Sequence, residues 1–199
     1  LGAVAVRWNI GRSRYTVEPG LYAVGSPTAE APLLATANYK FSFDILREAF
    51  EGLDAWILIL DTQGINVWCA AGKGTFGTDE LIRRMEATGV ARVVGHTTLV
   101  LPQLAAPGVA AHEVRRRTGF RVVYGPVRAS DLSAFLRGGM RATPQMRRVQ
   151  FGFRDRLAVV PVELVQRFAW AVLIMLVFFL AAGVGRHGYH LAMAHWPEM

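Results

Sequence analysis

The sequence predicts an α/β domain with a largely parallel, Rossmann-like or flavodoxin-like sheet, followed by a C-terminal transmembrane helix. Two observations predict this. Short apolar runs alternate with segments of helical periodicity through the first 140 residues, which is typical of β-α-β units. Residues 168–185 then carry no charge. We therefore expect the α/β domain over residues 1–140, a basic connector over 141–166 and the membrane helix over 167–186.

The apolar runs predict strands at residues 3–8, 33–37, 56–60, 92–94, 99–101 and 121–124. Helix signals fall between them. Ser42 is expected to cap one helix, and Thr78 to open a second that buries Leu81, Ile82 and Met85. A third helix is expected over 112–118, ended by a glycine at 119, and a fourth over 130–136.

The uncharged run is long enough for a bilayer. As a helix, residues 168–185 would extend about 27 Å, at about 1.5 Å per residue. Seven arginines precede this run between positions 137 and 167, and only Arg186 follows it, so the N-terminal domain is expected in the cytoplasm, at the cytoplasmic membrane. The net charge is +7, but the basic residues gather beside the apolar run without interleaved aromatic residues. This pattern indicates membrane lipid as partner rather than nucleic acid.

The chain contains one cysteine, Cys69. A single cysteine cannot form an internal disulfide, which is typical of a reducing compartment. It also cannot supply the roughly four ligands of an iron–sulfur cluster. Any electron that the chemistry requires is therefore expected from a separate donor.

The most informative segment is DTQGINVWCAAGKGTFG, residues 61–77, which follows the apolar strand WILIL. In a parallel sheet this strand-to-helix junction lies at the carboxyl ends of the strands, where ligands bind. Glycines at 64, 72, 74 and 77 and the small Ala70 and Ala71 leave room for a flat or bulky ligand.

Two familiar motifs fail. A P-loop would need glycine at Val67 and Ser or Thr at Gly74, and a zinc protease helix would need histidine at Arg116. Cys69 is then either a small buried hydrophobic residue or a ligand, with Lys73 one helical turn away. Trp68 is either a core anchor or a ligand contact.

The segment NVWCAAGKGTFGT resembles the cap-helix motif of the mercury-methylating corrinoid protein family (HgcA), whose pattern is N-[VI]-W-C-A-[AS]-G-K. The stretches TANYKFSFD, GLDAWILILDTQG, LPQLAAPGVAAHEV, GFRVVYGPVRASD and PVEL are also similar to that family. That family is related to the cofactor domain of the corrinoid iron–sulfur protein. The resemblance implies a cobalamin-type corrinoid with Cys69 as the lower axial ligand of cobalt. It also implies a cap around the corrinoid formed by Asn66, Val67, Trp68, Ala70, Ala71, Gly72 and Lys73.

The resemblance further implies several membrane helices, of which all but one would be missing by truncation. It also implies a methyltransferase of anaerobic one-carbon metabolism. It would move a methyl group from methylcob(III)amide to Hg(II), forming methylmercury, with an HgcB-type ferredoxin-like iron–sulfur protein as electron donor and a methylated folate system as methyl source. The segments Leu101-Pro102-Gln103 and Gly125-Pro126 either line a pocket for the cofactor's tail or form ordinary turns.

Two alternatives stay open. A corrinoid methyl carrier of the acetyl-CoA pathway type would use a different acceptor, and such a carrier gains little from a permanent thiolate ligand. A membrane-anchored interaction domain would bind no cobalt.

Overall fold

The computed structural model describes residues 8, 14–50, 52–182, 184–185 and 188–189. Apart from Trp8, the strand expected at residues 3–8 lies outside the described residues. The chain divides into two compact units, residues 11–150 and residues 1–10 with 151–199, and each is described by itself.

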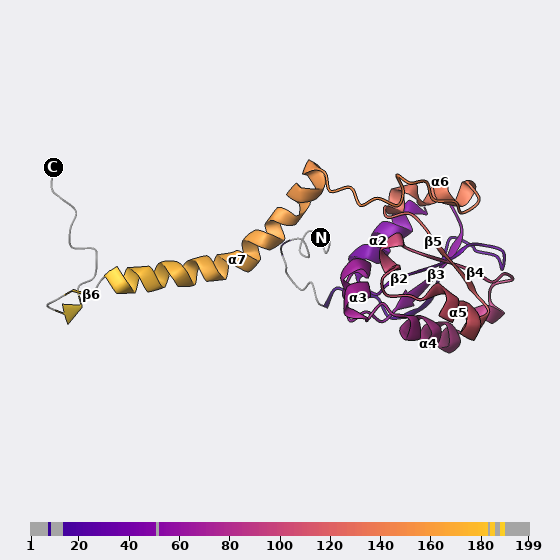
Figure 1. Ribbon diagram of the computed structural model, residues 1–199, viewed down its shortest axis with the longest axis horizontal. Helices are drawn as coiled ribbons and strands as arrows, with labels where there is room; N and C mark the ends of the chain where they lie inside the picture. The colour runs from indigo at the N-terminus through magenta and orange to yellow at the C-terminus, as the bar shows by residue number, and fades with distance from the viewer. Residues whose placement is uncertain (1–7, 9–13, 51, 183, 186–187, 190–199) are drawn as a thin grey trace. The chain divides into compact units, whose positions relative to one another are not determined.

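A five-stranded sheet forms the centre of the larger unit (Figure 1). Its order is β1 (Gly20–Val24), β3 (Ala55–Leu60), β2 (Leu33–Ala37), β4 (Thr98–Leu101) and β5 (Arg121–Tyr124). Strands β3, β2, β4 and β5 run parallel, and only β1 is antiparallel, at the edge beside β3. The predicted α/β class with a largely parallel sheet is therefore confirmed.

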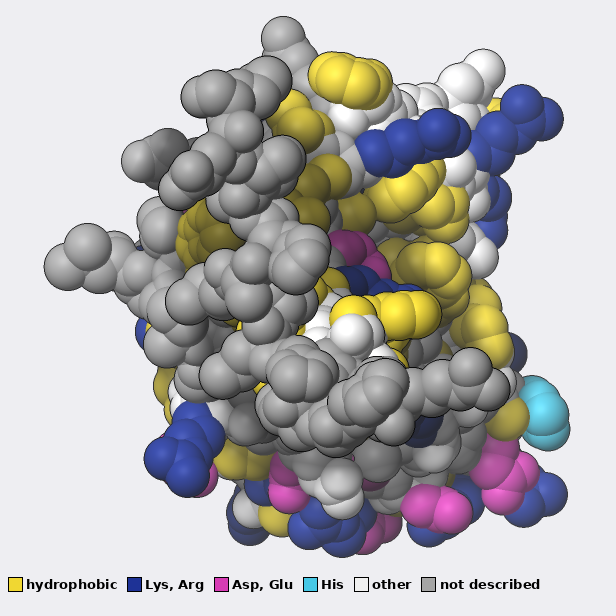
Figure 2. All heavy atoms as spheres, turned by 90° about the vertical axis from the view of Figure 1, so that its left-hand side faces the viewer, with side chains coloured by type: hydrophobic (Ala, Val, Ile, Leu, Met, Phe, Trp, Pro, Cys, Tyr) yellow, Lys and Arg dark blue, Asp and Glu magenta, His cyan; other side chains and the backbone are white. Residues whose placement is uncertain are grey.

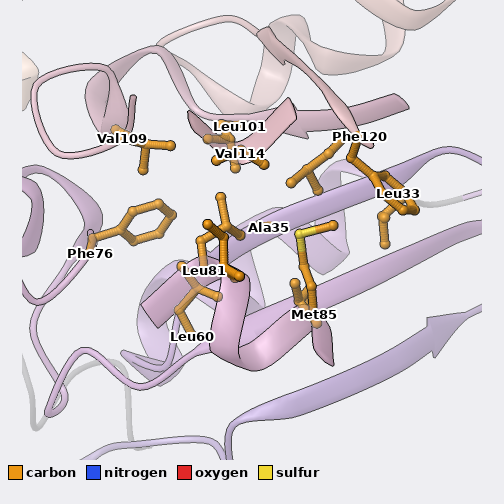
Figure 3. Packing of buried hydrophobic residues seen from close by; sticks show 14 of the residues in the cluster. Leu33, Ala35, Leu60, Phe76, Leu81, Met85, Leu101, Val109, Val114 and Phe120 are labelled. Atoms are coloured by element: carbon orange, nitrogen blue, oxygen red, sulfur yellow. The ribbon is translucent and has the colours of Figure 1, made fainter. Parts of the chain in front are cut away.

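Helices cover both faces of this sheet. The helices α4 (Thr78–Thr88) and α5 (Ala111–Thr118) lie on one side in Figure 1, and α2 (Lys40–Ala49) and α6 (Leu132–Arg137) on the other. Side chains of β2 alternate between the two faces: Leu33 and Ala35 belong to the core under α4 and α5, and Leu34 to the core under α2 and α6. Figure 3 shows Leu81 and Met85 of α4 turned toward Leu33 and Ala35 of β2.

Charged residues cover the outside of α4 and α5. Figure 2 shows acidic and basic side chains interleaved along the lower edge of that view, at the height of these two helices. Arg117 of α5 lies 2.6 Å from Asp79 of α4, and Arg84 pairs with Glu80 at 3.1 Å. The hydrogen bond to Asp79 raises the pKa of Arg117 above its ordinary value. The Arg117–Asp79 pair joins α5 to α4, whereas the Arg84–Glu80 pair lies within α4.

The order of the strands creates a switch point. From β2 the chain crosses through α2 to β3 on one side, and from β3 it passes back through α3 (Val67–Lys73) and α4 to β4 on the other side. In doubly wound sheets, ligands bind outside the carboxyl ends of the strands where the connections diverge in this way. Here that position lies between β2 and β4.

Several predicted elements need correction. The strand expected at 92–94 is wrong, because a 3-10 turn (Val90–Arg92) occupies this region and buries Val90 and Val94, four residues apart on one face. The Ser42 cap is also wrong: α2 begins at Lys40, with Tyr39 at the cap position, and an ion pair of 2.7 Å joins Lys40 to Asp44 in the second turn. The strand β1 was not predicted.

Other predicted elements are confirmed. The strand at 33–37 has the predicted bounds, and the strands at 56–60, 99–101 and 121–124 differ by at most one residue. Helix α4 begins at Thr78 and buries Leu81, Ile82 and Met85. Helix α5 ends at Gly119, which has a left-handed backbone with φ 78°.

The smaller unit contains α7 (Phe153–Ala182) and a short hairpin of β6 (Val184–Gly185) and β7 (Gly188–Tyr189). From residue 155 to residue 182, α7 is long and apolar enough to cross a membrane. It begins inside the segment expected as a connector and continues through Pro161, which removes one backbone hydrogen-bond donor from the helix. The segment before residue 150 packs on the larger unit, since Val127 donates to the Met146 carbonyl at 2.8 Å.

Candidate cofactor site

The site is built on the short helix α3, which follows β3 after a six-residue loop. Asn66 caps the helix, and its side-chain oxygen accepts a hydrogen bond from the Cys69 backbone N–H at 2.9 Å. Gly74 ends the helix in a left-handed conformation with φ 81°. The segment Val67–Lys73 thus forms about two helical turns with a cap at each end.

The two faces of α3 differ sharply. Val67, Ala70 and Ala71 are buried against the domain, whereas Trp68 is 63% exposed and Cys69 is exposed. The interpretation of Cys69 as a buried hydrophobic residue is therefore wrong, and so is that of Trp68 as a core anchor. Gly72 and Lys73 are also exposed. A thiol and an indole therefore lie side by side in the chain on a helix that keeps both available to a ligand.

Helix α3 is seated at the switch point of the sheet. It packs against β2 and against the 3-10 turn Gln103–Ala105 that follows β4. The approach is close at Gly108, where an added Cβ would lie 2.3 Å from the Phe76 carbonyl oxygen and 3.0 Å from the Ala71 Cα atom. Only glycine fits there without moving backbone. Thr78 also holds the loop that contains Gly108, because its hydroxyl accepts a hydrogen bond from the Ala110 N–H at 2.9 Å.

A polar residue that sequence reasoning missed anchors the loop before α3. Asn38, directly after β2, is 6% exposed, and its side-chain oxygen accepts from the Thr62 N–H at 3.1 Å and the Gly64 N–H at 2.9 Å. Thr62 is fully buried. The available signal was a hydrogen-bonding side chain immediately after a fully buried strand, at the carboxyl end of the sheet.

The segments expected to line a tail pocket lie at the neighbouring strand ends. Leu101 and Gly125 are buried and joined, since the Gly125 N–H donates to the Leu101 carbonyl at 2.8 Å. Pro102 precedes the turn that contacts α3. The Gln103 side-chain oxygen accepts from Arg147 at 3.1 Å. These contacts show turn-forming and packing roles, and the role in a tail pocket stays a prediction.

Tyr124, at the end of β5, also secures the site. Its hydroxyl donates to the Val109 carbonyl at 2.6 Å, one residue from the close approach at Gly108. Burial raises the pKa of the Tyr124 phenol above its ordinary value. The loop that supports α3 is therefore held from both β5 and α4.

A doubly wound α/β domain with an exposed thiol and indole on a capped helix at its switch point belongs to the class of cofactor-binding domains. Residues 8–136 match the family described as CO dehydrogenase/acetyl-CoA synthase delta subunit (CdhD). The chain therefore belongs to this family.

Relatives are gamma subunits of the acetyl-CoA decarbonylase/synthase complex. The subunit of Methanocaldococcus jannaschii is 32% identical over 128 residues, which cover 63% of this chain and 26% of the relative. The subunit of Methanopyrus kandleri is 32% identical over 127 residues, which cover 63% of this chain and 27% of the relative. The subunit of Archaeoglobus fulgidus is 29% identical over 138 residues, which cover 67% of this chain and 29% of the relative. The matched part of the chain thus spans between a quarter and a third of these relatives' length.

This family membership corrects the assignment that the resemblance implied. The prediction of a mercury-methylating protein is wrong, and with it mercury methyltransferase activity, Hg(II) as substrate and an HgcB-type partner. The reason lies in where the quoted stretches fall: all but PVEL lie within residues 8–136, the part that matches the acetyl-CoA family. They therefore report the shared cofactor fold and not the methyl acceptor.

The prediction of a corrinoid is confirmed, because this is a corrinoid protein family. The residues of α3 fit such a group. A Cβ added at Gly72 or Gly74 would meet nothing within 4 Å, so the outer side of the helix end is open. The exposed Trp68 provides a flat apolar surface beside Cys69, and small alanines lie beneath. A broad, flat ring fits this surface.

Proposed function

We propose that this chain carries the corrinoid domain of a methyl carrier in one-carbon metabolism, of the type that serves an acetyl-CoA decarbonylase/synthase complex. The family match over residues 8–136 supports the methyl-carrier role, since the relatives are subunits of that complex. The observation that carries the proposal is the exposed Cys69 on a capped helix at the switch point. The partners we propose are other subunits of such a complex.

Each residue of the cap has a proposed role. Cys69 would offer its thiolate to the cobalt as a displaceable ligand, because a carrier gains little from a permanent one. Asn66 holds the Cys69 backbone through the 2.9 Å hydrogen bond, and Trp68 would contact the ring. Val67, Ala70 and Ala71 pack the helix against the domain, and Gly72 and Lys73 would border the ring. When bound, the corrinoid supplies a cobalt centre that accepts and releases a methyl group.

We also propose that α7 anchors the domain to the cytoplasmic membrane, with residues 11–150 in the cytoplasm. Its side chains from Phe168 to Leu180 include a nearly continuous run of exposed apolar residues. Exposed apolar surface of this extent is typical of contact with lipid. Seven arginines precede the uncharged run and one follows it, which favours the cytoplasmic side for the domain.

Reconstitution of the full chain with cobalamin in detergent micelles tests the proposal. The wild-type chain should take up about one cobalt and show a visible band that Cys69→Ala removes. The matched control moves the thiol: Cys69→Ala combined with Ala87→Cys places it on the exposed side of α4 and should not restore the band. A chain without bound cobalt, or a band unchanged by Cys69→Ala, would contradict the proposed site.

The acceptor needs a separate measurement. The chain loaded with labelled methyl is mixed with the catalytic subunit of an acetyl-CoA decarbonylase/synthase complex. We expect the label to leave the wild-type chain in the presence of that subunit and to remain without it. Retention of the label in both cases would refute a carrier role in this type of complex.

A further inference from the structure

The end of β2 is tied to the loop that precedes the cap helix. Asn38 follows β2, and its backbone continues the sheet: its N–H donates to the Leu60 carbonyl at 3.0 Å, and its own carbonyl accepts from Val17 at 2.9 Å. Both backbone groups are therefore occupied. The side chain, 6% exposed, is left to serve the neighbouring loop.

That side chain is oriented unambiguously. The Asn38 side-chain oxygen Oδ1 accepts hydrogen bonds from two backbone N–H groups, that of Thr62 at 3.1 Å and that of Gly64 at 2.9 Å. Because an amide nitrogen cannot accept, the oxygen must face these donors. The Thr62 hydroxyl also lies 2.9 Å from this oxygen and 2.7 Å from the Ile65 carbonyl, so its single proton can serve either. The Asn38 nitrogen lies 3.4 Å from an Asp61 carboxylate oxygen.

The loop needs such support because its backbone is strained. Gln63 has φ 57° and Gly64 has φ 71°, two consecutive residues in the left-handed region. Gln63 carries a side chain, and such residues rarely adopt this conformation. It persists only where the surroundings fix it, and strain held in this way concentrates at functional sites. Two residues later the chain reaches Asn66, which in turn holds Cys69.

We propose that Asn38 is a positioning residue for Cys69. It holds the left-handed turn at Gln63 and Gly64, and this turn fixes where Asn66 starts α3 and therefore where the thiol stands over the carboxyl ends of β2 and β4. Asn38 acts through the loop and makes none of the contacts assigned to the ring. The inference rests on the proposed function of Cys69.

The test uses the full chain and three variants. Asn38→Ala removes the acceptor and leaves two backbone N–H groups without it. The exchanged pair Asn38→Asp with Asp61→Asn is the rescue: it keeps an oxygen acceptor toward Thr62 and Gly64 and avoids two facing carboxylates. Position 61 also keeps a side-chain oxygen for the Gln63 N–H, which donates to Asp61 at 3.1 Å. Thr36→Ala is the control, because Thr36 is a buried polar residue of the same strand, 3% exposed, two residues before Asn38.

The readout is hydrogen exchange of the Cys69 backbone amide, measured without cofactor. We expect Asn38→Ala to speed this exchange about tenfold or more relative to amides of β3, since each buried donor left unpaired is costly. The exchanged pair should return it toward the wild-type rate, and Thr36→Ala should leave the ratio unchanged. With cobalamin bound, Asn38→Ala should weaken the thiolate-dependent band.

The proposal is overturned if Asn38→Ala leaves the Cys69 exchange ratio unchanged, or if Thr36→Ala raises it equally. These results are distinguishable from failure of the proposed function. A wild-type chain that takes up no corrinoid would refute the function, while the exchange rates would still decide whether Asn38 positions Cys69.

Discussion

Two glycines at the site should respond in opposite directions to the same substitution. At Gly108 an added Cβ would lie 2.3 Å from the Phe76 carbonyl oxygen, 3.0 Å from the Ala71 Cα atom and 3.2 Å from the Ala71 Cβ atom. The two nearest atoms are backbone, so relief requires the loop to move away from α3. Overpacking of this kind costs about 1–3 kcal/mol, and Gly108→Ala should lower the free energy of unfolding by this amount.

At Gly72 an added Cβ would meet nothing within 4 Å, and the residue lies inside α3. Replacing a helical glycine by alanine stabilises a helix by about 0.5–1 kcal/mol, so Gly72→Ala should raise the free energy of unfolding. The same methyl would stand on the open side of the helix and should weaken corrinoid uptake. One variant therefore separates stability of the fold from binding of the cofactor.

Urea unfolding of both variants, followed by tryptophan fluorescence, measures the two free energies. For a chain of this size, 1 kcal/mol corresponds to a shift in Tm of about 2–4 °C. Equal changes in the free energy of unfolding for Gly108→Ala and Gly72→Ala would refute the reasoning, because the expected difference depends only on the atoms that surround each glycine. Destabilisation at Gly72 would likewise show that α3 is not packed as described.

The remaining predictions concern two aromatic residues. Trp68→Ala should change the free energy of unfolding by less than about 0.5 kcal/mol, since the side chain is 63% exposed, and should weaken cobalamin uptake; loss of stability without loss of uptake would contradict this. Tyr124→Phe removes the 2.6 Å hydrogen bond to Val109 and should cost about 0.5–1.5 kcal/mol at neutral pH. Burial raises the pKa of Tyr124, so the contribution of its phenol to the free energy of unfolding is complete below the pKa of the unfolded state and is lost as the pH rises through the folded pKa. The variant lacks this ionisable group, so it should lose less stability than the wild type in the alkaline range. A pH dependence identical to that of the wild type, from unfolding curves at neutral and alkaline pH, would contradict this.

Local sequence determines much of this fold. The strand LLATA has the predicted bounds because four of its five residues are apolar and all five are buried, as expected for a parallel strand covered on both faces. The antiparallel edge strand GLYAV was missed because its side chains are mostly half-buried and its pattern is weak. The strand expected at 92–94 is wrong because a 3-10 turn covers Val90–Arg92, and the buried Val94 follows this turn, four residues after the buried Val90.

The site was predictable only in part. The cap helix follows from local signals: an asparagine that caps, a glycine that ends the helix, and small residues between. The exposure of Trp68 and Cys69 does not follow from them, because it depends on which face of α3 meets β2 and the turn after β4. Asn38 was missed for the same reason, since its partners at Thr62 and Gly64 come from another strand end.

The resemblance of the cap motif led to the correct cofactor and the wrong acceptor. The sequence of a cap helix depends on the cofactor that the helix contacts, so the residues around Cys69 indicate the corrinoid. The proposed acceptor class rests instead on the match over residues 8–136 with the acetyl-CoA family.

The central claim is a contact between the Cys69 sulfur and the cobalt of a bound corrinoid. X-ray absorption at the cobalt edge of the methylated full chain tests it most directly, beside the variant in which the thiol is moved from residue 69 to residue 87. We predict a sulfur neighbour of cobalt in the wild type and none in the variant. A nitrogen or oxygen neighbour in the wild type, or the same spectrum in both proteins, would contradict the account.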